Sequence, residues 1–155
     1  MIKGIMIEEE LDKYLSHPFF ERVNVPNISI DTVLSMMMVT PEGVNCNLSS
    51  DNINVFKDDM NEVPNIQKEL DYLAKAYEEE AVYLKKLHLP MILICAKAAI
   101  ADKIKEARFK EIIDSFFDSN NAEYKKACGN TMNSKINVNK RIEIMLDYYK
   151  KQIAK

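Results

Sequence analysis

Groups able to carry out acid–base, metal or nucleophilic chemistry are few in this sequence and lie far apart. It contains two histidines, His17 and His88, and three cysteines, Cys46, Cys95 and Cys128. Structural zinc sites use ligand pairs with about two to five residues between them, whereas six residues lie between His88 and Cys95, and there is no second pair. We therefore predict no metal site. An odd number of widely spaced cysteines also predicts no disulfide framework and a reducing compartment.

Neither histidine stands in a pattern typical of catalysis. His17 precedes Pro18, and we interpret it as a loop or packing residue. His88 ends an amphipathic segment, where a cation favours the C-terminal end of a helix. The sequence has no G-x-S-x-G or H-E-x-x-H motif and, with three glycines, no phosphate-binding glycine loop. These observations predict no catalytic residue, no cofactor and a non-enzymatic protein.

Carboxylates offer the one enzymatic alternative. Glu111 and Asp114 lie three residues apart on an expected helix, and Glu78, Glu79 and Glu80 precede them. Helices that present paired carboxylates to each other can hold Mg²⁺, which prefers oxygen ligands. The run of three glutamates is contiguous, so its members point around a helix and share no face. A solvated acidic face is the favoured interpretation, and a carboxylate- and Mg²⁺-dependent hydrolase is the third hypothesis for function.

Charge is unevenly distributed along the chain. The net charge is −3 overall, but it is −7 over residues 1–64, +4 over residues 65–155 and +6 from Tyr124 onwards. Lysines in the last segment could neutralise phosphates and release counterions, and tyrosines could stack on bases. The candidate contact residues for a partner or a nucleic acid are Lys125, Lys126, Lys140, Arg141, Lys150, Lys151 and Tyr148.

This basic segment has three interpretations. It could be an ordinary solvated face, a nucleic-acid contact, or a surface that pairs with the acidic half of another copy in a head-to-tail assembly. Arginine, which usually reads base edges, is scarce, and the whole chain is acidic. A nucleic-acid-binding accessory factor is therefore the second hypothesis for function.

Methionine is abundant, with nine in the chain and three in a row at Met36, Met37 and Met38. Three consecutive residues of a helix cannot all face one core, and methionine adapts well to contact surfaces. We predict that this triplet contacts a partner, with core packing as the alternative. Our first hypothesis is thus a non-enzymatic helical protein-interaction or assembly protein that self-associates or binds a protein partner.

The elements that would carry these residues are mainly α-helical, since three glycines and five prolines are few for an all-β chain. We expect one domain over residues 1–155, a compact bundle of about five to seven helices. Residues 1–63 form an acidic part with short elements, and residues 64–155 form long amphipathic helices with a basic C-terminus. The expected helices cover 7–15, 29–39, 49–60, 65–88, 91–117, 122–128 and 137–153.

Breaks between these helices follow local signals. An extended connector is expected over residues 23–28, a short strand near residues 44–48, a kink or break at Pro90 and a left-handed helix cap at Gly129. The longest apolar run, 89–101, has 13 residues, whereas a membrane helix needs about 20. With no signal-peptide pattern at the N-terminus, this predicts a cytoplasmic protein without membrane contact.

Abundant Lys, Asn and Ile are associated with AT-rich genomes. Such genomes occur in many phages and in low-GC bacteria. We expect a phage or mobile element as one source, in which case the protein would act in the host cytoplasm. No motif in the sequence identifies a family.

Overall fold

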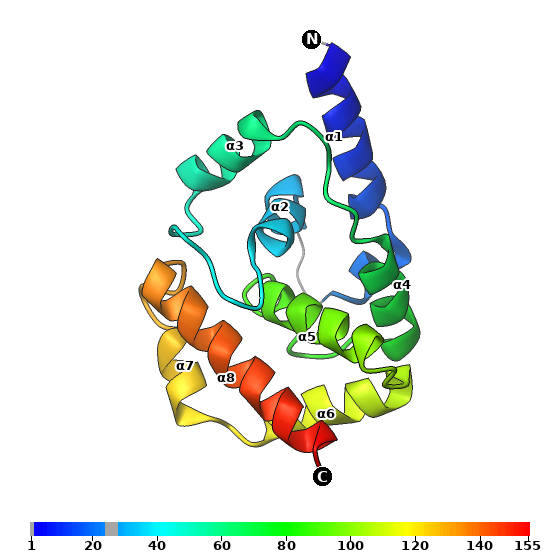
Figure 1. Cartoon of the computed structure of the whole chain (residues 1–155), viewed down its shortest axis with the longest axis vertical. Helices are drawn as coiled ribbons and strands as arrows, with labels where there is room; N and C mark the ends of the chain where they lie inside the picture. Colours follow the sequence, from blue (N-terminus) through cyan, green and yellow to red (C-terminus); the bar gives the residue numbers. More distant parts are fainter. Residues whose placement is uncertain (1, 24–27) are drawn as a thin grey trace.

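The computed structural model describes residues 2–23 and 28–155, and its regular elements are all helical (Figure 1). Most of the expected connector, residues 24–27, lies outside these ranges. The prediction of a compact, mainly α-helical fold is confirmed. Nowhere in the described ranges is a helix both long and apolar enough to cross a bilayer. The elements are α1 (Ile2–Leu15), the 3-10 helix η1 (Pro18–Arg22), α2 (Ile30–Met38), α3 (Ser50–Asp59), α4 (Gln67–Ala76), α5 (Leu89–Ala101), α6 (Glu106–Asp118), α7 (Ala122–Ala127) and α8 (Lys135–Ile153).

Helix α5 is the centre of the core. Every residue from Leu89 to Ala96 is buried, as expected for a helix that is apolar on all sides. It packs against α2, α4, α6 and α8, and Figure 1 shows these helices arranged around it. Burying each large apolar side chain contributes about 1.5–3 kcal/mol, so this helix anchors the elements on both sides of it.

Helix α8 lies along α5 and buries one continuous stripe. Val138, Ile142, Met145 and Tyr149 are each almost fully buried, and their spacing of three and four residues is that of one helical face. The sequence predicted this stripe, and the prediction is confirmed. Ser134 caps the helix by accepting a hydrogen bond from the Asn137 backbone N–H at 3.2 Å.

The single helix expected over residues 65–88 is wrong. Helix α4 ends at Ala76, and residues 77–88 form turns. Tyr77 is fully buried, and its hydroxyl bonds to that of Tyr83 at 2.7 Å. Leu84 is also fully buried at a turn, its N–H bonded to the Ala81 carbonyl. The apolar spacing thus correctly predicts that Tyr77 and Leu84 are buried. Both side chains reach the core from turns rather than from a continued helix.

The continuous helix expected over residues 91–117 is also wrong, because α5 and α6 are separate. Lys103 has a left-handed φ of 59°. The N–H of Ile104 bonds to the Ala99 carbonyl and that of Lys103 to the Ile100 carbonyl, which is the Schellman pattern that ends helices. Glycine usually occupies this left-handed position. A lysine there gives no sequence signal, so the break was missed.

Three smaller expectations fail for local reasons. Residues 44–48 are not a strand, and the described residues contain only an isolated bridge between Thr40 and Gly43. Gly129 is not left-handed, since Gly43 is the glycine with positive φ in the described ranges. Pro90 neither kinks nor ends a helix but lies in the first turn of α5, where its missing N–H has no intrahelical acceptor to lose.

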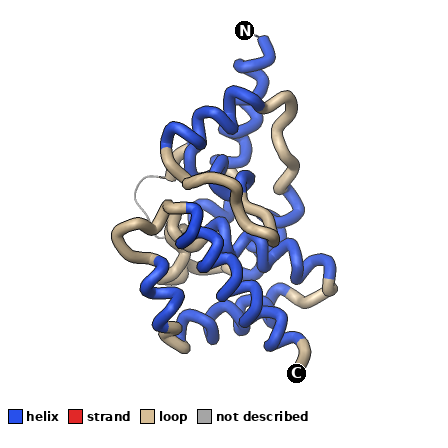
Figure 2. The backbone as a smooth tube through the Cα atoms, turned by 60° about the vertical axis from the view of Figure 1, so that its left-hand side comes forward, coloured by secondary structure: helices blue, strands red, loops and turns tan. Residues whose placement is uncertain are grey.

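Helix α1 extends from the rest of the molecule. It begins at Ile2 rather than at residue 7 as expected. Its first turns lie beyond the other helices in both views (Figures 1 and 2). Ile7 and Leu11 bury one side of the helix, while Ile5 and Met6 are more than half exposed. Lys57 of α3 bonds to Glu8 at 2.6 Å and ties the two helices together.

Candidate functional site

The lysines predicted as contact residues are all exposed. Lys125 and Lys126 lie on α7, and Lys140, Lys150 and Lys151 lie on α8. Lys151 forms an ion pair with Asp147 at 3.0 Å. Tyr148 is half-buried, and its hydroxyl is hydrogen-bonded to that of Ser115. Tyr148 therefore spans between α8 and α6 instead of presenting a free ring for stacking.

Arg141 differs from its neighbours on α8. The sequence placed it on the solvated basic face of this helix, and that placement is wrong because its side chain is 1% exposed. Its Nη1 donates to the backbone carbonyls of Ala127 at 2.7 Å and Met132 at 2.6 Å. Of its two neighbours in the sequence, Lys140 is exposed and Ile142 is buried. Arg141 thus connects the end of α7 to the following loop from inside the protein.

The methionine triplet packs against the core. Met36 is fully buried, and Met37 and Met38 are partly buried against the same core cluster. A nine-residue helix such as α2, covered by α1, α3 and α5, can place three consecutive side chains on neighbouring elements. Core packing, the alternative in the sequence analysis, accounts for what the structure shows of these residues.

Exposed apolar side chains occur in two regions that differ in net charge: on α1 and α3, and around the loop between α7 and α8. The first, which we name the acidic surface, comprises Ile5 and Met6 of α1 and Val55 of α3, each more than half exposed. Exposed carboxylates accompany them on the same two helices. These carboxylates are Glu8, Glu9, Glu10, Asp58 and Asp59. An open groove of about 510 Å³ lies between the two helices, with Ile5, Ile7 and Met60 in its walls together with the ion pair of Glu8 and Lys57.

The second place, which we name the basic surface, surrounds the loop between α7 and α8. Met132 is exposed, and Ile136 in the first turn of α8 is 77% exposed. Exposed lysines on both helices accompany them. These lysines are Lys125, Lys126, Lys135 and Lys140. Ile136 lies off the buried stripe of α8, which begins at Val138, and this offset is the sequence signal that could have identified it.

No protein family, curated protein or solved structure matches this chain. Its function must therefore be inferred from its own surfaces and pockets. Single exposed apolar residues are normal on proteins. Clusters that also carry one sign of charge are better candidates for contact with a partner.

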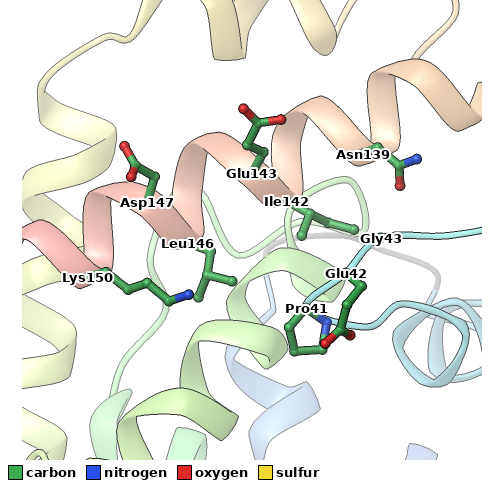
Figure 3. Close-up of a pocket in the computed structure, with 9 residues that line it drawn as sticks. All are labelled: Pro41, Glu42, Gly43, Asn139, Ile142, Glu143, Leu146, Asp147 and Lys150. Carbon is green, nitrogen blue, oxygen red and sulfur yellow. The ribbon is translucent and has the colours of Figure 1, made fainter.

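A pocket of about 370 Å³ lies where the 41–43 turn meets α8 (Figure 3). Figure 3 shows Glu143 and Asp147 directed away from Pro41 and Glu42, so the acidic groups do not converge. Asn139 fixes the turn instead. Its Oδ1 accepts from the Val44 N–H at 2.7 Å, and its Nδ2 donates to the Val44 carbonyl at 3.3 Å. We therefore interpret this pocket as a consequence of the contact between Asn139 and the turn, and its side chains are not arranged for catalysis.

Four of the five carboxylates of the Mg²⁺ hypothesis, Glu78, Glu79, Glu111 and Asp114, line one pocket of about 420 Å³, and Glu80 does not. Lys75 and Lys110 line it too. In the described part of the chain, no three or more His, Cys, Asp or Glu side chains are grouped so that they could hold a metal ion. The pocket is therefore a mixed-charge groove between the end of α4 and α6.

Asp114 of this groove belongs to a series of hydrogen-bonded side chains that the sequence did not reveal. Asp114 accepts a hydrogen bond from the Tyr83 hydroxyl at 2.6 Å and pairs with Lys110 at 2.8 Å. The Tyr83 hydroxyl also bonds to that of Tyr77, and burial raises the pKa of both tyrosines. Because each carboxylate oxygen of Asp114 already has a partner, this residue acts as a structural support of the 77–88 segment.

Proposed function

We propose that this protein is a non-enzymatic assembly protein whose copies join head to tail, the acidic surface of one docking on the basic surface of the next. The observation that carries the proposal is that each surface combines exposed apolar side chains with an excess of one sign of charge, and the two signs are opposite. Because the two surfaces are different, each copy can bind two others, which builds rings or filaments.

Charge complementarity within a single chain favours a second copy as the partner. Residues 1–64 carry a net −7, and the chain from Tyr124 onwards carries +6. Apolar anchors such as Ile136 and Ile5 would supply most of the affinity. The surrounding charges would set orientation and speed association.

The first test is the mass of the full chain by sedimentation velocity and light scattering over a range of concentrations. We expect a mass above the 17.9 kDa of one chain, rising with concentration and falling as added salt screens the charges. Ile136→Ser should weaken association at least tenfold. The control is Val82→Ser, since Val82 is 76% exposed, as Ile136 is, but lies on the 77–88 segment outside both surfaces.

Paired charge reversals give the sharper test. One variant carries Lys125→Glu and Lys126→Glu, and the other carries Glu9→Lys and Glu10→Lys, all at exposed positions. Each variant alone should associate much more weakly than the wild type, because the reversals cancel most of the charge of one of its two surfaces. An equimolar mixture should assemble again. A wild-type chain that stays monomeric at every concentration, or a mixture that stays monomeric, contradicts the proposal.

Nucleic-acid binding by the exposed lysines of α8 is the competing outcome. A monomeric chain that retards DNA or RNA at low salt, and loses this activity when Lys140, Lys150 and Lys151 are replaced by alanine, would favour it over assembly. Retardation that is unaffected by these replacements would assign neither function to the basic surface. Arg141 is left out of this test because it is buried.

A further inference from the structure

Arg141 carries a buried charge that lacks a carboxylate partner among the described residues. Only its Nη1 is seen to donate, to the two carbonyls of Ala127 and Met132. Its Nε is buried with no hydrogen-bond partner, and no ion pair with an acidic side chain involves it. A buried cation without a counter-charge is strongly unfavourable, and burial accordingly lowers the pKa of Arg141. An anion beside the guanidinium would remove this cost.

A second unpartnered donor belongs to Thr32, which lines the same pocket as Arg141. Thr32 is 4% exposed, and its Oγ1 is buried with no hydrogen-bond partner in the described chain. It lies in the first turn of α2, whose preceding residue Ser29 makes no side-chain cap. The positive end of this helix dipole therefore lies beside Thr32. Arg141 and Thr32 come from sequence positions more than one hundred residues apart, yet both line a single pocket of about 300 Å³.

The rest of the pocket wall has a charged part and an apolar part. Lys85 and Lys86 add two exposed cations, and Asp31 is the one carboxylate that lines it. With Arg141, these groups carry a net charge of +2 at neutral pH. The remaining wall is largely apolar and includes Leu48, Ile53, Leu87 and Pro90.

We propose that this pocket binds a small organic phosphate, with its phosphate group held by Arg141 and Thr32 and its organic part against the apolar wall. A phosphate monoester carries close to two negative charges at neutral pH, which matches the net charge of the wall. Arginine binds phosphate oxygens through its planar fork of N–H donors. A volume of about 300 Å³ is at the lower end for small-molecule sites and leaves room beyond the anion. The two central residues of this site are buried within one chain, while Met132 of its wall also belongs to the basic surface.

The test is a titration of the full chain at constant ionic strength with three probes: inorganic phosphate, phenyl phosphate and benzoate. Two-dimensional ¹⁵N NMR follows the Arg141 Nε–H and the Thr32 backbone N–H. We expect saturable shifts of both signals with phosphate and tighter binding of phenyl phosphate, whose ring fills the apolar wall. Benzoate, with the same ring and a single charge, should bind at least tenfold more weakly.

Variants separate ligand binding from the structural role of Arg141. Thr32→Val keeps the side-chain shape and removes the hydroxyl, and should weaken phenyl phosphate binding about tenfold. Lys85→Ala should also weaken it. Lys68→Ala, at an exposed lysine of α4 outside this pocket and outside both named surfaces, is the matched control and should leave phenyl phosphate binding unchanged. Arg141→Lys keeps the positive charge but loses the planar set of N–H donors, and should abolish binding. If circular dichroism shows that this variant does not fold, the result for Thr32→Val tests the proposal.

Two outcomes would overturn the proposal. Shifts that do not saturate, or that persist unchanged in Thr32→Val, would mean that phosphate contacts the surface lysines without entering the pocket. Equal affinity for benzoate and phenyl phosphate would show that the site selects a carboxylate or the ring alone and would refute a phosphate site. Neither outcome depends on the oligomeric state, so the assembly proposal would stand or fall separately.

Discussion

The imidazole of His88 and the hydroxyl of Tyr124 form a hydrogen bond of 2.8 Å at Nδ1, and the two rings stack with centroids 5.5 Å apart. This contact joins the start of α5 to α7. Burial, assisted by the positive charges of Arg141 and Lys85, lowers the pKa of His88 to about 4. His88 is therefore neutral at pH 7 and packs at the start of a helix. The sequence interpretation of a cation at a helix C-terminus is wrong.

A neutral buried His88 predicts that acid destabilises the protein. In the unfolded chain its pKa is near 6.5, so the unfolded state takes up a proton as pH falls below 6.5 while the folded state does not until about pH 4. Stability is thus complete above pH 6.5 and falls below it, by about 2 kcal/mol at pH 5. Urea unfolding at pH 7, 6 and 5 measures this loss. In His88→Gln the loss over this window should be smaller by that amount; an unchanged profile would contradict the prediction.

Gly43 is required at the turn that faces α8. Its φ is 110°, and a Cβ there would lie 2.4 Å from Oδ1 of Asn139. Gly43→Ala should therefore lower the free energy of unfolding by about 2 kcal/mol or more, from backbone strain and displacement of Asn139. Gly4→Ala is the control, because a Cβ there meets no atom within 4 Å. It should leave stability unchanged or raise it by up to about 1 kcal/mol. Equal effects of the two variants would refute this account of the turn.

Lys103 ends α5 in a conformation that suits glycine better. The left-handed backbone costs a residue with a Cβ about 1–2 kcal/mol, partly offset by the greater flexibility of glycine in the unfolded chain. Lys103→Gly should raise the free energy of unfolding by about 0.5–1 kcal/mol, measured by urea denaturation. Lys97→Gly, at an exposed position inside α5, should instead lower it by about 1 kcal/mol. A loss of stability in Lys103→Gly would show that the lysine side chain itself holds the helix end.

Asp114 and Glu111 should respond differently to loss of charge. Asp114→Asn weakens two charge-assisted hydrogen bonds, to Tyr83 and Lys110, and should cost about 1–2 kcal/mol of stability. Glu111 is exposed, and its nearest cation, Arg108, is 3.9 Å away. Glu111→Gln should therefore change stability by less than about 0.5 kcal/mol. Thermal unfolding of both variants checks the contrast; a large effect of Glu111→Gln would indicate a role for the groove that the structure does not explain.

The candidate surfaces could be predicted only in part. The charge asymmetry is visible in the sequence, and so are the exposed lysines of α7 and α8. The exposed apolar residues beside them were not identified. The only signal of Ile136 is its offset from the buried stripe of α8, and Ile5 precedes the helix that was expected over residues 7–15. Thr32 was missed for a related reason. Its hydroxyl matters only because folding brings it to the pocket that Arg141 also lines.

The sequence by itself determined that the protein is helical and which residues fill its core. On α8, apolar residues three and four positions apart form one face, and α5 is apolar on all sides. Both segments remove their apolar side chains from water by forming buried helices. Only the tertiary structure decided where the helices stop and which polar groups are buried. Lys103 adopts a left-handed turn and Arg141 lies inside the protein because packing and hydrogen bonds with distant segments outweigh the preferences of each residue alone.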